Sequence, residues 1–252
     1  EKFNHILIHS KTSEFKDLDD ALNNMMNRIT DAFVKEKLFI GNVSHELLTP
    51  IAILKNRFEN LIQNQSLDDI AIDKISNSLN TLDVMKKVIN NLLLISRIDN
   101  KQFQTNEEIN INEIITELIG NLKDRIQERE IGVVKNIKES FHFKGNKTLI
   151  QVMIANLITN AIKYNKPFGN ISVTDSWNNK HYTLLISDTG IGMNMEQLSR
   201  IFDRFTRINF EQDGHGIGLA IVDSIAKLHQ IEIQVESEIN QGTTFKIIFP
   251  IS

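Results

Sequence analysis

Residues 15–62 are predicted to form one long helix, and this pattern limits the possible folds most strongly. Its apolar side chains alternate at intervals of three and four over residues 15–32, and successive steps of four follow at Val43, Leu47 and Ile51. Such spacing places the apolar side chains on one stripe of a helix, as in a coiled-coil seam. A second helical pattern follows residues 64–69, where Ser66 and Asp69 are typical of a helix start. Two antiparallel helices alone cannot bury the apolar stripes of both helices. The sequence therefore predicts a homodimer that forms a four-helix bundle.

The character of the chain changes at about residue 105, where helical patterns begin to alternate with short β-branched and aromatic runs. This mixture predicts a two-layer α/β sandwich, with helices on one face of a mixed sheet. Residues 190–216 are weakly patterned and rich in glycine, which is typical of a mobile lid. The predicted strands are 132–138, 170–176, 181–187, 231–237 and 243–249. The predicted helices are 112–128, 147–164, 194–202 and 216–229.

Composition excludes several classes of function. The chain has 252 residues and a formal net charge of −4, so it lacks the basic footprint of a nucleic-acid-binding protein. The absence of cysteine excludes disulfides, zinc–thiolate sites and thiol catalysis. No apolar run approaches the roughly 18 to 20 residues that span a bilayer. The chain begins at Glu1 close to a heptad pattern, and we interpret it as a fragment whose upstream part is missing.

The first chemical motif is Ser44-His45-Glu46 with Thr49-Pro50, inside the first predicted helix. Imidazole has an unperturbed pKa near neutrality, so His45 can act as a neutral nucleophile. Glu46 is long enough to bend toward the ring and take a proton from it. The alternative is an exposed helix histidine beside a chance glutamate, since the chain contains seven histidines.

The second motif places Asn156, Asn160, Lys163 and Tyr164 at i, i+4, i+7 and i+8 of an otherwise apolar helix. Asparagine carbonyls are hard oxygen ligands that suit Mg²⁺, which prefers few protein ligands together with phosphates and waters. Lysine supplies positive charge to a phosphate. An ordinary solvated helix face would show the same stripe, so the motif alone leaves both interpretations open.

Asp188 ends a predicted strand and is followed by Gly190 and Gly192. A carboxylate in this place can accept a hydrogen bond from an adenine amino group, and the glycines let the backbone approach the base. The same Asp-x-Gly-x-Gly pattern is also common in simple turns.

A second glycine-rich segment contains Gly214, Gly216 and Gly218 and precedes the helical stretch 219–229. Glycine-rich backbone at a helix N-terminus is suited to hold phosphate. The segment lacks the Gly-Lys-Ser/Thr of a Walker A motif. No strand leads into it, so it is not a dinucleotide-binding fingerprint either.

Taken together in this order and spacing, the segments resemble the H, N, G1, F and G2 boxes of sensor histidine kinases, over about residues 35–250. The resemblance implies ATP with Mg²⁺, His45 as the phosphorylated nucleophile, Glu46 as base, and a response-regulator aspartate as acceptor. It also implies that Thr49 orients a water in a reverse phosphatase reaction, and that Asn160 is the metal ligand. The nucleotide-binding residues that it implies are Asn156, Asn160, Lys163, Tyr164, Asp188, Gly190, Gly192, Phe205, Arg207, Gly214, Gly216, Ile217, Gly218 and Leu219.

The same resemblance divides the chain into three parts. Residues 1–36 would be a signalling coiled coil, similar to the end of a HAMP module. Residues 37–104 would be the dimerisation and histidine-phosphotransfer domain, and residues 105–252 the catalytic ATP-binding domain. The whole would be the cytoplasmic portion of a bacterial protein anchored in the inner membrane. The departures from the family pattern are Leu48, Asn146 and His215.

Two alternatives remain beside this interpretation. Topoisomerase-type or chaperone ATPases and serine kinases share the ATP fold, but they lack the Ser-His-Glu-x-x-Thr-Pro helix. A degenerate kinase could serve as a dimeric scaffold, although the intact Asn160, Asp188 and lid glycines argue against this.

Overall fold

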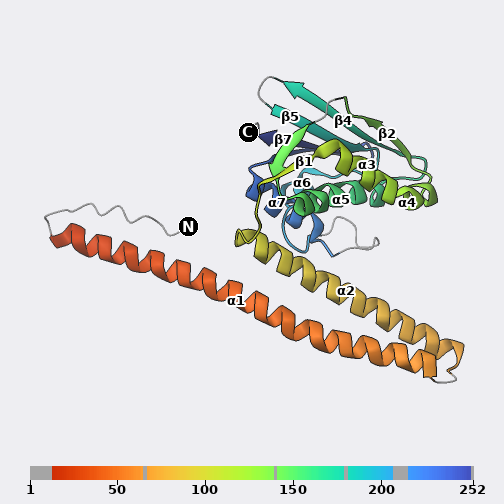
Figure 1. The fold of residues 1–252 in the computed structure, drawn as a ribbon, viewed down its shortest axis with the longest axis horizontal. Helices are drawn as coiled ribbons and strands as arrows, with labels where there is room; N and C mark the ends of the chain where they lie inside the picture. The colour runs from red at the N-terminus through yellow and green to blue at the C-terminus, as the bar shows by residue number, and fades with distance from the viewer. Residues whose placement is uncertain (1–12, 65–66, 139–140, 179–180, 207–214, 251–252) are drawn as a thin grey trace.

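A long helical hairpin lies against an α/β sandwich in the computed structural model (Figure 1). At residues 13–19 and 29–45 only the backbone is described, so the side chain of His45 lies outside the described part. The structure describes residues 13–64, 67–138, 141–178, 181–206 and 215–250.

The hairpin consists of α1 (Ser13–Asn64) and α2 (Asp69–Asp99), which confirms both predicted helices. Helix α1 continues through Pro50 without a break. The cap of α2 is Asp68, whose carboxylate accepts a hydrogen bond from the Ala71 N–H at 2.8 Å. Such a cap satisfies an amide at the helix start that has no partner within the helix. Ser66, which the sequence suggested at this place, lies outside the described residues.

The two helices share a small buried cluster formed by Ile51, Leu82, Ile89 and Leu93. Lys55 and Asp83 pair across the hairpin at 2.6 Å. Many other apolar side chains of the hairpin stay exposed in the single chain, as expected of a bundle that is completed by a second copy. These exposed side chains are Leu22, Met25, Leu47, Ile53, Leu54, Ile70, Ile72, Val84 and Met85.

The sandwich is built on a five-stranded sheet with the order β2-β4-β5-β7-β6. The β2–β4 pair is parallel and the other pairs are antiparallel, so the sheet is mixed, as predicted. All five predicted strands are present. They are β2 (Gly132–Asn136), β4 (Asn170–Asn178), β5 (His181–Asp188), β6 (Glu232–Glu238) and β7 (Gly242–Pro250).

Helices cover one face of this sheet (Figure 1). The prediction of one helix over 112–128 was wrong, because the chain breaks at Leu122 and forms two shorter helices. A small antiparallel pair, β1 (Glu107–Asn110) with β3 (His142–Gly145), was not predicted. The helices are α3 (Ile111–Asn121), α4 (Lys123–Glu128), α5 (Lys147–Lys163), α6 (Met195–Ser199) and α7 (Gly218–His229).

The end of α2 belongs to the core of the sandwich. Ile95 and Ile98 are 1% and 2% exposed and pack in the same cluster as the buried residues of α5, α7 and the sheet. Helix α2 therefore contacts α1 on one side and α7 on the other. It lies between α1 and the sandwich (Figure 1).

A buried histidine, His229, connects α7 to α5. The His229 Nε2 accepts a hydrogen bond from the Asn146 N–H at 3.0 Å, and its Nδ1 lies 2.9 Å from the Ile225 carbonyl. Burial lowers the pKa of His229, so the ring is neutral near pH 7. Asn146 also caps α5 by accepting from the Leu149 N–H. The start of α5 is thus held to the end of α7.

Candidate active site

Asp188 stands at the end of β5, at the junction of the sheet with the helical layer. Its Oδ1 accepts a hydrogen bond from the Gly190 N–H at 2.8 Å. Burial raises the pKa of this carboxyl, while hydrogen bonds from the backbone of Gly190 and Thr243 act in the opposite direction. A partly buried carboxylate that the backbone holds in place is suited to accept a hydrogen bond from a ligand N–H.

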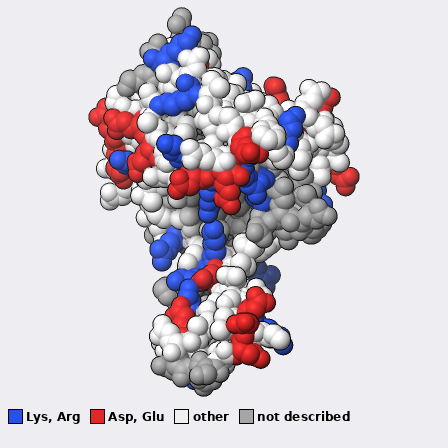
Figure 2. Space-filling view, turned by 90° about the vertical axis from the view of Figure 1, so that its right-hand side faces the viewer, with Lys and Arg blue, Asp and Glu red and all other residues white. Residues whose placement is uncertain are grey.

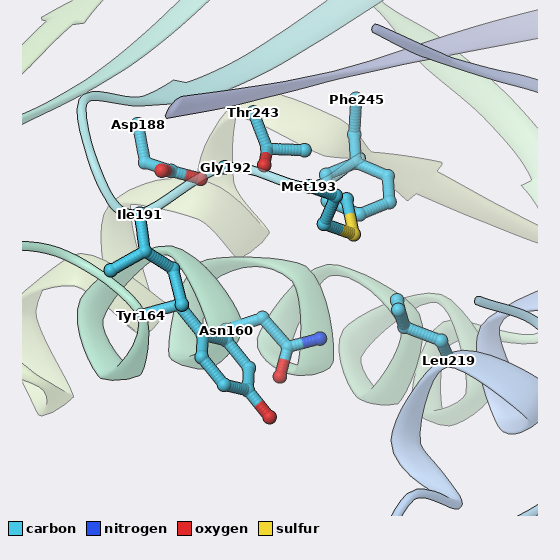
Figure 3. Close-up of a pocket in the computed structure, with 9 residues that line it drawn as sticks. All are labelled: Asn160, Tyr164, Asp188, Ile191, Gly192, Met193, Leu219, Thr243 and Phe245. Atoms are coloured by element: carbon cyan, nitrogen blue, oxygen red, sulfur yellow. The ribbon is translucent and has the colours of Figure 1, made fainter. Parts of the chain in front are cut away.

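Asp188 faces a small apolar slot between the sheet and α5 (Figure 3). Figure 3 shows the Asn160 amide and Leu219 on the opposite side from Asp188 and Thr243. The free volume of the slot is about 30 Å³, enough for about one water molecule. A purine ring would enter only if side chains such as those of Ile191, Met193 and Leu219 moved apart. The slot is lined by Asn160, Tyr164, Asp188, Ile191, Gly192, Met193, Leu219, Thr243 and Phe245.

The glycines after Asp188 shape the slot through close backbone contacts. A Cβ atom on Gly190 would lie 2.2 Å from the Tyr164 carbonyl oxygen. Gly192 has a φ of +63°, and a Cβ there would lie 1.9 Å from the Glu238 carbonyl oxygen. Both positions therefore exclude a side chain without a shift of the backbone. Gly190 itself lines neither the slot nor the larger cleft beside it.

The larger cleft has a volume of about 660 Å³ and adjoins the slot. It shares Asn160, Tyr164 and Leu219 with the slot, so the two form a continuous site. The predicted stripe of α5 lies along it, and the Lys163 Nζ donates to the Tyr164 hydroxyl at 2.8 Å. The described lining residues comprise Asn80, Asp83, Val84, Lys87, Asn91, Asn156, Thr159, Asn160, Lys163, Tyr164, Ile201, Thr206, His215, Gly216, Ile217, Gly218 and Leu219.

The second glycine segment forms an edge of this cleft at the start of α7. A Cβ on Gly218 would lie 2.7 Å from the Asn156 side-chain oxygen, so the backbone comes close to the α5 stripe only because the residue is glycine. Ile217 is buried directly before α7. Gly214 and Arg207 lie outside the described residues.

Phe205 is not brought to the site. Its side chain is 58% exposed, and its N–H donates to the Gly216 carbonyl at 2.8 Å. Phe202, three residues earlier, is half-buried against the core. Of the two aromatic residues in this segment, only Phe202 packs inward.

The Ser44-His45-Glu46 motif lies on α1. Glu46 and Thr49 are exposed, and Thr49 borders a shallow surface hollow with Leu48, Ala52 and Ile53. Lys55 pairs with Asp83 in an antiparallel hairpin, so His45, ten residues before Lys55, lies level with Leu93, ten residues after Asp83.

Helix α2 also lines the large cleft, which was not predicted from the sequence. Its five lining residues, Asn80, Asp83, Val84, Lys87 and Asn91, stand at i, i+3, i+4, i+7 and i+11, which is one face of a helix. That polar face was readable in the sequence, but its position over α5 depends on tertiary packing. Thr243 and Phe245 were also missed, because strand register brings them beside Asp188.

Two family models match the chain. Residues 35–101 match the His Kinase A (phospho-acceptor) domain, and residues 145–252 match the histidine kinase-, DNA gyrase B-, and HSP90-like ATPase. The chain belongs to the sensor histidine kinases. It contains the two domain types of a protein-histidine kinase, and its helical hairpin and α/β sandwich agree with the predicted fold class. The HAMP-like module of residues 1–36 remains a prediction.

Related sensor kinases align with nearly the whole chain. The heme sensor protein HssS of Staphylococcus saprophyticus is 31% identical over 98% of this chain and 54% of its own length. The signal transduction histidine-protein kinase ArlS of Staphylococcus haemolyticus is 33% identical over 98% of this chain and 55% of its own length. The chain thus spans about half the length of these relatives.

Two solved structures share the fold. Full-length ShkA in complex with AMPPNP aligns over 84% of this chain and 45% of its own, with a TM-score of 0.71 and 21% identity. Histidine kinase AdeS of Acinetobacter baumannii covers 82% of this chain and 98% of its own, with a TM-score of 0.60 and 23% identity.

Proposed function

We propose that the chain transfers the terminal phosphoryl group of Mg²⁺-ATP to His45 and then to an aspartate of a response regulator. The observation that carries this proposal is that Asp188 and Asn160 face one slot, which adjoins a larger cleft edged by Gly216 and Gly218. A slot for a base beside a cleft for phosphates fits a nucleoside triphosphate. The phospho-acceptor helix is on the same chain.

The residues present fit a magnesium nucleotide. Among the described residues, no group of three or more His, Cys, Asp or Glu side chains is placed to hold a metal. A cation in the cleft would be held by the Asn160 amide oxygen, phosphates and water, as Mg²⁺ prefers. Mg²⁺, when bound, neutralises phosphate charge.

In the proposed reaction a ring nitrogen of His45 forms a bond with the terminal phosphorus, and the bond from phosphorus to the bridging oxygen breaks. ADP leaves with the electron pair of that bond, and Glu46 takes the proton from the other ring nitrogen. Positioning and charge neutralisation supply most of the rate in such transfers. The phosphoryl group then passes from His45 to the carboxylate of the regulator, which restores the imidazole.

The exposed hollow around Thr49 supports a role for this part of α1 in docking the regulator. There Thr49 would orient a water that hydrolyses the phosphorylated regulator. The exposed apolar side chains of the hairpin support a homodimer.

We further propose that residues 37–104 and 105–252 are the two functional domains of the cytoplasmic portion of a longer, membrane-anchored sensor. The relatives, which are nearly twice as long, support this. None of the described helices combines the length and apolarity needed to cross a bilayer.

The test is incubation with ATP labelled at the terminal phosphate, followed by acid and base treatment. We expect label that is lost in acid and retained in base. His45→Gln should abolish labelling while nucleotide binding survives, and Asn160→Ala should lose Mg²⁺-ATP binding. Equal labelling of His45→Gln and the wild type would overturn the assignment, and a wild type that binds no nucleotide would favour a scaffold.

A further inference from the structure

Helix α2 forms one wall of the large cleft. Asn80, Lys87 and Asn91 line it, together with the polar stripe of α5 and with Gly216 and Gly218 at the start of α7. The helix that builds the dimerisation hairpin thus also faces the region where the phosphates of a nucleotide would lie.

This wall is fixed to the sandwich at its C-terminal end. Ile95 and Ile98 are buried in the sandwich core, about one and two turns beyond Asn91, the last of the cleft-lining residues of α2. Just past them, the Asp99 carboxylate pairs with Arg204 of the lid segment at 3.3 Å. The position of Lys87 relative to α5 is therefore set by packing, and not by a loose contact of two surfaces.

The charges of the cleft distinguish Lys87 from its neighbours. Three charged side chains are among the described lining residues: Asp83, Lys87 and Lys163. Asp83 is compensated by Lys55 of α1 at 2.6 Å. Lys163 already donates to the Tyr164 hydroxyl at 2.8 Å. Lys87 is the cation that α2 presents to the cleft, and Figure 2 shows Lys and Arg side chains along the narrow region where the hairpin meets the sandwich.

We propose that Lys87 binds the polyphosphate of the nucleotide, so that α2 contributes a phosphate-binding residue to the ATP site. The inference rests on the proposed function, which places phosphates in this cleft. An ammonium group on a flexible stem can follow a phosphate as a point charge without a fixed bidentate geometry. Asn91, one helical turn further on, lies on the same wall and can donate a hydrogen bond beside it. Nucleotide binding and the docking of α2 on the sandwich are then linked, each favouring the other.

The test compares Lys87→Ala with Lys86→Ala in the full chain. Lys86 is the adjacent exposed lysine on α2 and does not line the cleft, so it controls for net charge and helix propensity. Dissociation constants for ATP, ADP and adenosine are measured by calorimetry with Mg²⁺ at low and high salt. Because a charged contact at an exposed side chain is partly screened, we expect Lys87→Ala to weaken ATP about five- to tenfold at low salt. ADP should weaken less, adenosine should be unaffected, and Lys87→Arg should restore ATP affinity.

Each outcome decides the inference. Wild-type ATP affinity in Lys87→Ala would overturn it and leave the proposed function intact. An equal loss for ATP and adenosine would also overturn it, because that pattern indicates a general disturbance of the site. An equal loss in Lys86→Ala would overturn it by assigning the effect to net charge. A wild type that binds neither ATP nor ADP would remove the proposed function and this inference with it.

Discussion

Replacing Asp188 with Asn should change which purine the site accepts. The Asp188 Oδ1 is engaged by the Gly190 N–H at 2.8 Å, and an amide oxygen can keep that hydrogen bond. The amide NH₂ group then takes the place of the oxygen that would receive the adenine amino group. Two donors face each other, so the variant loses one hydrogen bond to a charged acceptor.

The loss of such a bond is worth about 1.5 to 3 kcal/mol, which corresponds to about 10- to 150-fold weaker ATP binding. Inosine triphosphate carries a carbonyl where ATP carries the amino group, and the introduced side-chain amide can donate to it. Asp188→Asn should therefore bind inosine triphosphate more tightly than ATP, while the wild type prefers ATP. Competition against a fluorescent nucleotide measures both constants, with Asp124→Asn, an exposed position in α4, as the matched control.

The same variant should be more stable without nucleotide. The pKa of Asp188 is raised by burial, so the folded state favours the protonated form. The contribution of this carboxyl to stability is complete below its unfolded pKa of 3.8 and is lost as pH rises through the raised folded value. Near pH 7 the ionised group disfavours folding, and the substitution removes that cost. A lower melting temperature for Asp188→Asn at pH 7, or an unchanged preference for ATP, would refute this reasoning.

Two further predictions concern the frame around the site. Gly190→Ala should destabilise the chain by about 1 to 3 kcal/mol in urea and weaken ATP binding, because the new Cβ would lie 2.2 Å from the Tyr164 carbonyl oxygen. Gly120→Ala in α3, where a Cβ meets nothing within 4 Å, is its control and should leave binding unchanged. The pKa of His229 is lowered by burial, so stability should fall as pH drops from about 6.5 toward the folded value, since the unfolded chain takes up the proton first. His229→Gln should reduce this dependence between about pH 7.5 and about pH 5.5 in thermal unfolding, and an unchanged slope would contradict the role given to His229.

Much of the fold follows from local patterns. The stripes of the hairpin and the five strands of the main sheet have strong periodicities of their own, which is why they were predicted correctly. The β1–β3 pair escaped notice because each strand has only four residues, as in Glu107–Asn110. The break at Leu122 was missed because Leu122 caps α4 without a side-chain hydrogen bond. The sequence therefore has no polar capping residue there that would predict a helix start.

In the candidate site, too, some residues could be predicted from local patterns and others could not. Asp188 and Asn160 were identified because each is polar at a place where the surrounding pattern is apolar, and the structure brings both to one slot. Phe205 followed from resemblance alone, and its side chain lies on the surface. Thr243 reaches the slot through strand register, and Lys87 reaches the cleft through packing of α2 on α7. Neither of these two positions can be predicted from the local sequence pattern.

The double role of α2 has a consequence for control of the kinase. Ile89 and Leu93 of α2 pack with Ile51 of α1, whereas Ile95 and Ile98 are part of the sandwich core. Because α2 is one rigid helix between these two clusters, a change in how α1 packs on it must either move the sandwich or strain the junction at the end of α2. The cleft-lining residues of α2, within 80–91, lie level with the part of α1 that follows His45. A shift of α1 against α2 would therefore alter the large cleft and the position of His45 together, without any separate relay between the two proposed sites.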